Sequence, residues 1–311
     1  MLTQAEHMTA TKTGIIWNPS KIDEDTLRNA VAKALDGEVQ WWETSKDDPG
    51  RGMALEAVEA GCDTVIAVGG DGTVRAVAEA LAGTDAVLGI VPQGTGNLLA
   101  RNLEIPLDNI GAALKRISAG DTRTIDLGWV TLDGEERAFT VMVGFGVDAQ
   151  MLVETDDDLK DRAGWLAYVE AMGRAMAGTE MTDIRITLDD EEPREVHGHT
   201  LLIGNCGMLQ GGIRLLPDAK LDDAQLDLLL VSADGPLQWL DTVRSFVWDN
   251  GIRRLLTGDE QAVSTESTRH QTAERIRVEL QAPLAFEVDG EELGEVSSFE
   301  VRVQAGALRV R

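Results

Sequence analysis

Apolar positions along the chain follow two different periodicities. Up to about residue 119, short apolar runs alternate with segments whose apolar residues recur every three or four positions, the spacing of one helix face. The clearest run is residues 65–68, four mostly β-branched residues that are too few for a helix. A glycine-rich turn follows, and helical spacing begins at Val74. Repetition of strand, loop and helix predicts a parallel sheet with helices on both faces.

The expected elements of this first part follow each other at short intervals. Strands are predicted at residues 14–17, 39–44, 65–68 and 86–91, and helices at residues 23–35, 53–60, 74–81 and 98–103. The strands run directly into polar or glycine-rich loops that contain Asn18, Thr44, residues 69–73 and residues 94–97. In open parallel sheets, ligands bind at the carboxyl ends of the strands. These loops are therefore the candidate binding region.

From about Asp126 the period changes to two, with acidic turns between the runs. Strands are predicted at residues 128–132, 137–143, 184–188, 196–203, 225–231, 275–280, 284–288 and 299–303. The Asp-Gly pairs between them fit hairpin turns. Helical insertions are expected at residues 159–177 and 236–256. The pattern predicts a loose tail (1–12, with Met8 as an alternative start), an α/β domain (13–126) and a β-rich domain (127–303), with residues 304–311 returning to the first domain.

Charge and cysteine content limit the class of protein. The formal net charge is −26, from 54 acidic and 28 basic side chains. This balance argues against nucleic-acid binding, which needs cations that neutralise phosphates, and against broad adhesion to anionic membranes. Cys62 and Cys206 form no metal or disulfide pattern. No apolar run approaches the roughly 20 residues that span a bilayer, and the start lacks the apolar core of a signal peptide. A cytoplasmic protein is expected.

The turn Gly69-Gly70-Asp71-Gly72-Thr73 links the apolar run to the next helix. Backbone N–H groups at such a helix start bind anions, phosphates above all, where no side chain obstructs them. Asp71 would repel a phosphate there, and a bound Mg²⁺ would remove this conflict because carboxylate and phosphate oxygens both bind that ion. The turn therefore predicts a magnesium–phosphate site. On this motif alone, a purely structural glycine turn stays an equal alternative.

Four motifs in order resemble the diacylglycerol kinase catalytic family, and more closely its soluble bacterial lipid-kinase branch. They are Asn18-Pro19, Gly69-Gly70-Asp71-Gly72-Thr73, Pro92-Gln93-Gly94-Thr95-Gly96-Asn97 and Asp289-Gly290-Glu291. The resemblance extends from about Thr13 to the C-terminus. It implies a fold like that of NAD kinase and diacylglycerol kinase: an N-terminal parallel α/β nucleotide-binding domain, then a mostly antiparallel, β-sandwich-like lipid-binding domain with helical insertions. ATP and lipid would meet in the cleft between the two domains.

The resemblance also assigns site residues. ATP would be held by Asn18, Pro19, Thr44, Gly69, Gly70, Asp71, Gly72, Thr73, Val74, Arg75, Gly94, Thr95 and Asn97. Asp71 would position the catalytic Mg²⁺. Glu291 is the expected proton acceptor, with Asp289 as its rival, although residues 289–291 also fit a plain hairpin turn. A structural Mg²⁺ would bind the carboxylate of Asp223 and the backbone carbonyls of Lys220 and Gln225, with Asp126 joined to it through a network.

Two further stretches bear on the resemblance. Leu98 stands where many family members have an aspartate, which lowers the expected number of carboxylates near the metal. Gly204-Asn205-Cys206 fits a family loop that lines the cleft, and an ordinary strand end fits these residues equally well.

The expected function is an ATP- and Mg²⁺-dependent kinase that phosphorylates a lipid alcohol, with diacylglycerol giving phosphatidate. Expected partners are ATP, the lipid and, by transient contact, the inner face of the membrane. Nucleic acid is not expected, and a homodimer is compatible with the family. Two alternatives stay open: an NAD kinase, which shares the GGDGT turn, and a catalytically inactive nucleotide-binding regulatory module.

Overall fold

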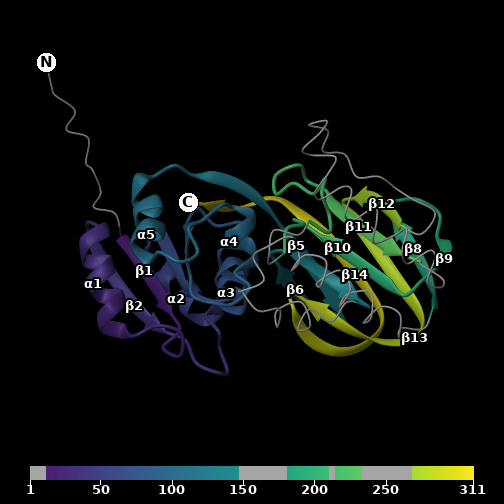
Figure 1. Ribbon diagram of the computed structural model, residues 1–311, viewed down its shortest axis with the longest axis horizontal. Helices are drawn as coiled ribbons and strands as arrows, with labels where there is room; N and C mark the ends of the chain where they lie inside the picture. The colour runs from purple at the N-terminus through teal and green to yellow at the C-terminus, as the bar shows by residue number, and fades with distance from the viewer. Residues whose placement is uncertain (1–11, 147–180, 210–213, 233–267) are drawn as a thin grey trace, which may run out of the picture. The chain divides into compact units, whose positions relative to one another are not determined.

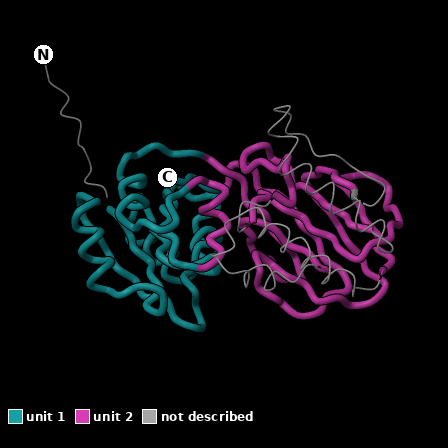
Figure 2. The backbone as a smooth tube through the Cα atoms, in the orientation of Figure 1, with its two compact units in different colours: residues 1–94, 105–123, 308–311 teal, residues 95–104, 124–307 magenta. Residues whose placement is uncertain are grey.

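The computed structural model describes residues 12–146, 181–209, 214–232 and 268–311. The predicted helical insertions at residues 159–177 and 236–256 lie outside these ranges. The described residues form two compact units (Figure 2). Unit 1 contains the chain up to Gly94, with Ile105–Arg123 and Leu308–Arg311; unit 2 contains Thr95–Glu104 and Thr124–Ala307. Both units therefore draw on separate stretches of the chain.

Unit 1 is built on a parallel sheet (Figure 1). Its strands are β1 (Lys12–Trp17), β2 (Glu38–Glu43), β3 (Thr64–Gly69) and β4 (Val87–Pro92), in the spatial order β4-β3-β1-β2. Every residue of β3 and β4 is buried, as expected for strands covered on both faces. The end of the last strand, β14 (Glu291–Val310), adds a parallel pairing in which Arg309 and Val310 lie opposite Val87 and Leu88.

Four helices cover the sheet of unit 1. They are α1 (Glu24–Ala34), α2 (Arg51–Glu59), α3 (Asp71–Leu81) and α5 (Ile110–Ala119). α1 packs against α5, and α2 packs against α3. The connection from β1 to β2 runs in the opposite direction across the sheet from the connections β2 to β3 and β3 to β4. Because such crossovers are right-handed, α1 lies on one face and α2 with α3 on the other.

Unit 2 is mainly antiparallel. It contains the short helix α4 (Leu98–Asn102) and the strands β5 (Arg123–Leu132), β6 (Glu135–Phe139), β7 (Met142–Phe145), β8 (Thr182–Leu188), β9 (Arg194–Gly198), β10 (Thr200–Gly204), β11 (Leu226–Val231), β12 (Thr268–Ala273), β13 (Arg275–Val288) and most of β14. The main order is β12-β11-β10-β7-β13-β14, with β8 paired with β13, β9 paired with β8, and β5 paired with β14 and β6. Its apolar core contains Phe139, Phe286 and Phe299. The predicted α/β plus β organisation is confirmed.

Several predicted strand boundaries were wrong, and one error has a chemical cause. Residues 137–143 were expected to form one strand, but β6 ends at Phe139 and β7 begins at Met142. The intervening N–H groups of Thr140 and Val141 bond to a side chain, the carboxylate of Asp289, instead of to a neighbouring strand. Residues 196–203 are likewise divided between β9 and β10, whereas residues 275–280 and 284–288 belong to one strand, β13, with an irregular register between them.

Two Asp-Gly turns confirm the hairpin prediction. Asp133-Gly134 joins β5 to β6, and Asp289-Gly290 joins β13 to β14. All four residues have positive φ, between 50° and 84°, as two-residue type I′ turns require. The second turn sets Val288 opposite Glu291. It therefore fixes where Asp289 and Glu291 stand relative to the strands.

Candidate functional site

The predicted nucleotide-binding loops of unit 1 lie at one edge of its sheet. Each follows the carboxyl end of a neighbouring parallel strand, so the edge collects the first three loops and Gly94, the part of the fourth loop that belongs to unit 1. Backbone hydrogen bonds join them: Asn18 N to Val68 O at 3.0 Å, Thr44 N to Trp17 O at 2.9 Å, and Gln93 N to Gly69 O at 2.8 Å. The Asn18 side chain is held by the Ser20 hydroxyl, which donates to Asn18 Oδ1 at 2.7 Å. The edge is thus a connected polar rim.

Within this rim, the turn at residues 69–73 opens helix α3. Gly70 is the cap residue and supplies no side chain to the helix start, and Asp71 lies in the first turn. Such a helix start presents backbone N–H groups and the positive end of the helix dipole to a ligand. This arrangement suits the phosphate site expected from the sequence.

The three glycines of the turn have different surroundings. A Cβ on Gly69 would lie 2.7 Å from Thr73 Cβ, and one on Gly70 would lie 3.2 Å from the Gly94 Cα. Packing inside the protein therefore accounts for these two glycines. Apart from the adjoining backbone of its own helix, a Cβ on Gly72 would meet no atom of the described residues within 4 Å. The space above Gly72 is open to an approaching ligand.

Two other predicted residues of this helix start are constrained by burial. The side chains of Thr73 and Val74 are buried, so these residues offer a ligand their backbone and not their side chains. Pro19 is exposed and Arg75 is half-buried. The structure thus separates residues that can touch a ligand from residues that shape the turn.

The second glycine loop begins in unit 1 with Gly94 and continues in unit 2 with Thr95 and Asn97. Asn97 has left-handed backbone angles (φ 48°, ψ 45°) and precedes helix α4. The side chain of Arg101 donates to Gly96 O at 2.6 Å and holds the loop. Leu98, the departure from the family pattern, is the half-buried first residue of α4.

The structure gives the two rival carboxylates, Asp289 and Glu291, different environments. Asp289 is buried, and its two oxygens accept four hydrogen bonds: Thr140 N at 2.8 Å, Thr140 Oγ1 at 3.0 Å, Val141 N at 2.9 Å and Met142 N at 3.0 Å. These donors engage both carboxylate oxygens, so Asp289 is poorly placed to contact a substrate hydroxyl. Glu291 is exposed at the start of β14. Of the pair, Glu291 has the access that a general base needs.

Asp126 organises the loop that was predicted to hold a structural metal. Its carboxylate accepts from Ala224 N and from Gly306 N, each at 2.7 Å, and its own N–H donates to Leu221 O at 2.6 Å. Asp223 follows in the same loop, where its Oδ1 accepts from Gln225 N at 3.1 Å. The Asp126 carboxylate therefore contacts the loop that contains Lys220, Asp223 and Gln225, and the metal assigned to this loop by the resemblance stays a prediction.

The chemistry of this loop fits a hydrated divalent cation. No cluster of three or more carboxylate, histidine or cysteine side chains suited to a metal occurs within the described ranges. A Mg²⁺ that keeps most of its waters needs only one carboxylate and a few carbonyl oxygens, which is the set expected here. Beside this loop, burial raises the pKa of Asp227 to about 7, with smaller contributions from the carboxylates of Asp223 and Asp218 and an opposing one from Lys220.

Sequence reasoning missed several residues that shape these sites. Thr140, Val141 and Met142 carry no motif, because their contribution is mainly through backbone N–H groups. Gly306 and Ala224 are also recruited through the backbone, by Asp126. Asn205, noted only within a candidate loop, donates through Nδ2 to Asp126 O at 2.9 Å.

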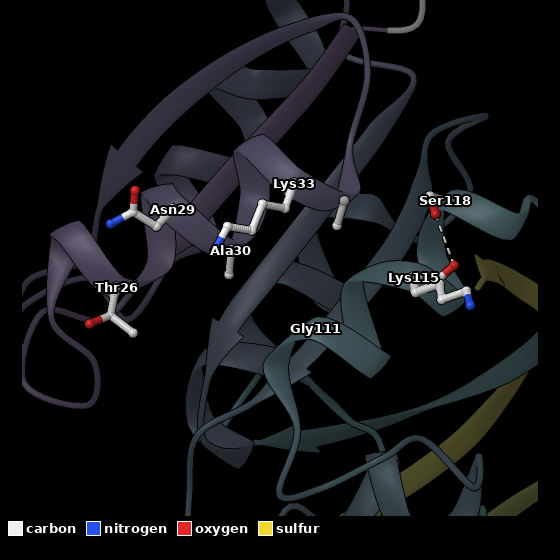
Figure 3. Close-up of a pocket in the computed structure, with 8 residues that line it drawn as sticks. Thr26, Asn29, Ala30, Lys33, Gly111, Lys115 and Ser118 are labelled. Carbon is white, nitrogen blue, oxygen red and sulfur yellow. Dashed lines mark hydrogen bonds between the residues drawn. The ribbon is translucent and has the colours of Figure 1, made fainter.

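A separate groove lies between α1 and α5 of unit 1 (Figure 3). It encloses about 770 Å³, and Lys33 and Lys115 come from opposite helices. Its other lining residues are Thr26, Asn29, Ala30, Ala34, Gly111 and Ser118. None of these is a predicted site residue, so the groove is distinct from the rim of glycine loops.

Comparison with known protein families separates the chain into two matches. The model of the diacylglycerol kinase catalytic domain matches residues 14–130, and the YegS C-terminal NAD kinase beta sandwich-like domain matches residues 141–311. A Xanthomonas campestris pv. campestris (strain 8004) protein named "Probable lipid kinase YegS-like" is 31% identical over 310 residues, which cover 96% of this chain and 94% of that protein. The chain belongs to the diacylglycerol kinase and YegS-like lipid kinase family.

A second relative matches over only part of its length, and two solved structures are similar at low sequence identity. The Mycobacterium tuberculosis (strain H37Rv) protein named "Diacylglycerol kinase" is 33% identical over 189 residues, and the match covers 59% of this chain and 60% of that protein. A solved diacylglycerol kinase from Bacillus anthracis str. Sterne has a TM-score of 0.70 at 21% identity, with 97% of each chain covered. An Archaeoglobus fulgidus NAD kinase in complex with ATP has a TM-score of 0.50 at 11% identity, over 96% of this chain and 93% of that one. The solved structures show the shared fold.

We predict that Asp289→Asn lowers the free energy of unfolding by roughly 2–4 kcal/mol, because an amide NH₂ would face N–H donors that the carboxylate now satisfies. Asparagine tolerates the left-handed turn, so the loss reports the hydrogen bonds. Urea unfolding measures the change. Glu291→Gln is the matched control on an exposed position, expected within about 0.5 kcal/mol of the wild type. Equal stability of both variants would contradict the four-bond role of Asp289.

A second prediction concerns pH. The pKa of Asp227 rises from 3.8 to about 7 on folding, so the folded state binds this proton more tightly than the unfolded chain. The stability that the chain gains from protonated Asp227 is fully present below about pH 4 and is lost as the pH rises through about 7. At pH 8 the free energy of unfolding of Asp227→Asn should therefore be higher than that of the wild type by about 2–4 kcal/mol. This difference should become smaller as the pH falls towards 4.

The pH prediction is measured by thermal or urea unfolding in EDTA, which removes divalent cations. Asp190→Asn, on an exposed turn, is the control and should shift the stability by less than about 0.5 kcal/mol at every pH. A stability difference for Asp227→Asn that does not change between pH 4 and pH 8 would refute the raised pKa.

Proposed function

We propose that the chain is an ATP- and Mg²⁺-dependent lipid kinase that transfers the γ-phosphoryl group of ATP to the hydroxyl of diacylglycerol, or of a related lipid alcohol. The products would be ADP and phosphatidate or the corresponding lipid phosphate. The observation that carries the proposal is the strand–turn–helix at residues 69–73, in a chain of this family. Its helix start has no capping side chain, and the space above Gly72 is open.

In this proposal the residues of the rim bind and orient ATP. Backbone N–H groups around Gly70 and Gly72 hold phosphate oxygens, as helix starts do in other phosphate sites. Asp71, in the first turn of α3, supplies the carboxylate for the catalytic metal ion. Mg²⁺, when bound, neutralises the charge on the β- and γ-phosphate oxygens. Asn18, Thr44 and Thr95 would contact the remainder of the nucleotide.

Glu291 is assigned the proton transfer. Phosphoryl transfer to an alcohol needs a carboxylate that orients the hydroxyl and accepts its proton. The exposed Glu291 suits this role, whereas the oxygens of Asp289 are engaged by residues 140–142. Asp289 then acts as a positioning residue, because it fixes the turn from which Glu291 projects.

Two rival functions share part of this support. An NAD kinase would use the same glycine turn, and the likeness to an NAD kinase structure is one of fold. The match of residues 14–130 to the diacylglycerol kinase catalytic domain favours a lipid acceptor. An inactive nucleotide-binding module is the second rival, and turnover excludes it.

Contact with a membrane is part of the proposal, because a diacylglycerol substrate resides there. None of the helices in the described ranges combines the length and the apolar character needed to cross a bilayer. We propose a cytoplasmic protein that touches the inner face of the membrane transiently. The homodimer expected from the resemblance stays a prediction.

The test of the function is transfer of labelled phosphate from ATP to diacylglycerol in mixed micelles with Mg²⁺. We expect wild-type transfer, and losses of at least 100-fold in kcat for Asp71→Asn and Glu291→Gln, since each removes charge stabilisation or proton transfer. Glu291→Gln should still bind ATP, as measured by calorimetry. Transfer to NAD instead of lipid would establish an NAD kinase, and absence of transfer to any lipid despite ATP binding would refute the proposal.

A further prediction uses the open space at Gly72. Gly72→Ala should leave the free energy of unfolding unchanged or slightly raised, since the new methyl group meets no atom of the described residues beyond the adjoining backbone of its helix. ATP affinity should fall about tenfold or more, because the methyl group occupies the approach of the phosphates. Gly111→Ala is the matched control, the second residue of another helix in unit 1, and should leave ATP affinity unchanged. If Gly72→Ala binds ATP as tightly as the wild type, the phosphates of ATP do not bind at this turn.

A further inference from the structure

Asn205 carries a buried polar atom for which the described residues supply no hydrogen-bond partner. The residue is 1% exposed, its backbone N–H donates to Val141 O at 2.8 Å, and its Nδ2 donates to Asp126 O at 2.9 Å. Its Oδ1 has no hydrogen-bond partner among the described residues. A buried acceptor without a donor costs free energy, so in folded proteins such atoms usually face a bound water, ion or ligand.

The orientation of this amide is fixed by its neighbour. Exchange of the Asn205 oxygen and nitrogen would place two oxygens, its own and the Asp126 carbonyl, at 2.9 Å with no proton between them. The oxygen is therefore the unsatisfied atom. It needs a donor or a cation from outside the described set of residues.

The position of Asn205 connects it to the acidic loop. In β10, Gly204 lies opposite Asp227 of β11 on one side and opposite Met142 of β7 on the other. Asn205 comes directly after β10 and lies at the end of β11 where that strand begins. β11 itself begins directly after Gln225. The backbone atom to which it donates belongs to Asp126, whose carboxylate holds Ala224 N in the same loop.

We propose that Asn205 belongs to the cation site of this loop, with Oδ1 accepting a hydrogen bond from a water of a divalent cation held by Asp223 and the carbonyls of Lys220 and Gln225. The proposal rests on the cation of the proposed function and adds a residue to its surroundings. Carboxamides one layer beyond the direct ligands orient metal-bound water and commonly contribute 10–100-fold to metal affinity.

This assignment gives Asn205 a second consequence. Its backbone bonds to Val141, and the Val141 N–H bonds to the Asp289 carboxylate. A continuous chain of hydrogen bonds therefore runs from the cation loop to the turn that carries Glu291. Asn205 is a positioning residue, because its hydrogen bonds fix the position of the cation loop relative to that turn.

The experiment is a Mg²⁺ titration of the thermal unfolding temperature of the full chain, without nucleotide or lipid, after treatment with EDTA. Four variants accompany the wild type. Asn205→Leu removes the acceptor at similar volume, Asn205→Asp keeps an oxygen acceptor, and Asp223→Ala removes the direct carboxylate. Asn102→Leu is the control, since both polar atoms of that amide are already paired with protein groups.

We expect Mg²⁺ to raise the unfolding temperature of the wild type and of Asn102→Leu with the same midpoint concentration. The midpoint should rise 10–100-fold in Asn205→Leu. It should rise less in Asn205→Asp, which keeps an oxygen acceptor but loses the Nδ2 donor to Asp126 O. In Asp223→Ala no Mg²⁺-dependent shift is expected. If Asn205→Leu does not fold in EDTA, Mn²⁺ binding to Asn205→Ala, measured by water-proton relaxation, gives the same comparison.

Three results would overturn the inference. An unchanged midpoint in Asn205→Leu would mean that an ordinary buried water serves Oδ1. An equal loss in Asn205→Asp and Asn205→Leu would mean that only the Nδ2 donor matters. Absence of any Mg²⁺-dependent shift in the wild type would mean that this loop binds no cation. The lipid kinase activity is tested separately, by transfer of labelled phosphate.

Discussion

Four hydrogen bonds to one carboxylate determine the geometry of the candidate site in unit 2. Asp289 draws the N–H groups of three consecutive residues, Thr140–Met142, towards the tip of the hairpin between β13 and β14. The same tip is a type I′ turn that sets Val288 opposite Glu291. Turn geometry and side-chain bonding therefore act on the same two-residue loop. The position of Glu291 is a consequence of both.

A comparable division of roles occurs in the glycine turn of unit 1. A side chain at Gly69 would collide with Thr73 and one at Gly70 would lie tightly against Gly94, whereas at Gly72 no atom of the described residues beyond the adjoining backbone lies within 4 Å. Short motifs of this kind combine positions that shape the backbone with positions that meet a ligand. The glycines in the sequence motif do not by themselves show which positions shape the backbone and which meet a ligand. The atoms around each Cβ position do.

The sequence predicted the elements that depend on local patterns. Buried runs such as residues 65–68 and the Asp-Gly turns at residues 133–134 and 289–290 carry their signal within a few neighbouring residues. The break between β6 and β7 could not be predicted in this way, because its cause, Asp289, lies 149 residues away from Thr140. The same holds for Gly306 and Ala224, which Asp126 recruits through backbone N–H groups that every residue except proline carries. The roles of Asp289 and Glu291 were separable only after burial and hydrogen bonds were known.

Strand β14 has a consequence for how the gene can be divided. The strand starts at Glu291 in unit 2 and ends with Arg309 and Val310 paired to β4 of unit 1, and unit 1 also takes residues 105–123 from the middle of the chain. No single cut yields an intact nucleotide-binding fragment, since any N-terminal fragment leaves one edge of β4 without its partner. Domain exchange between family members, or a split reporter built on this scaffold, therefore has to transfer the C-terminal segment together with the N-terminal one.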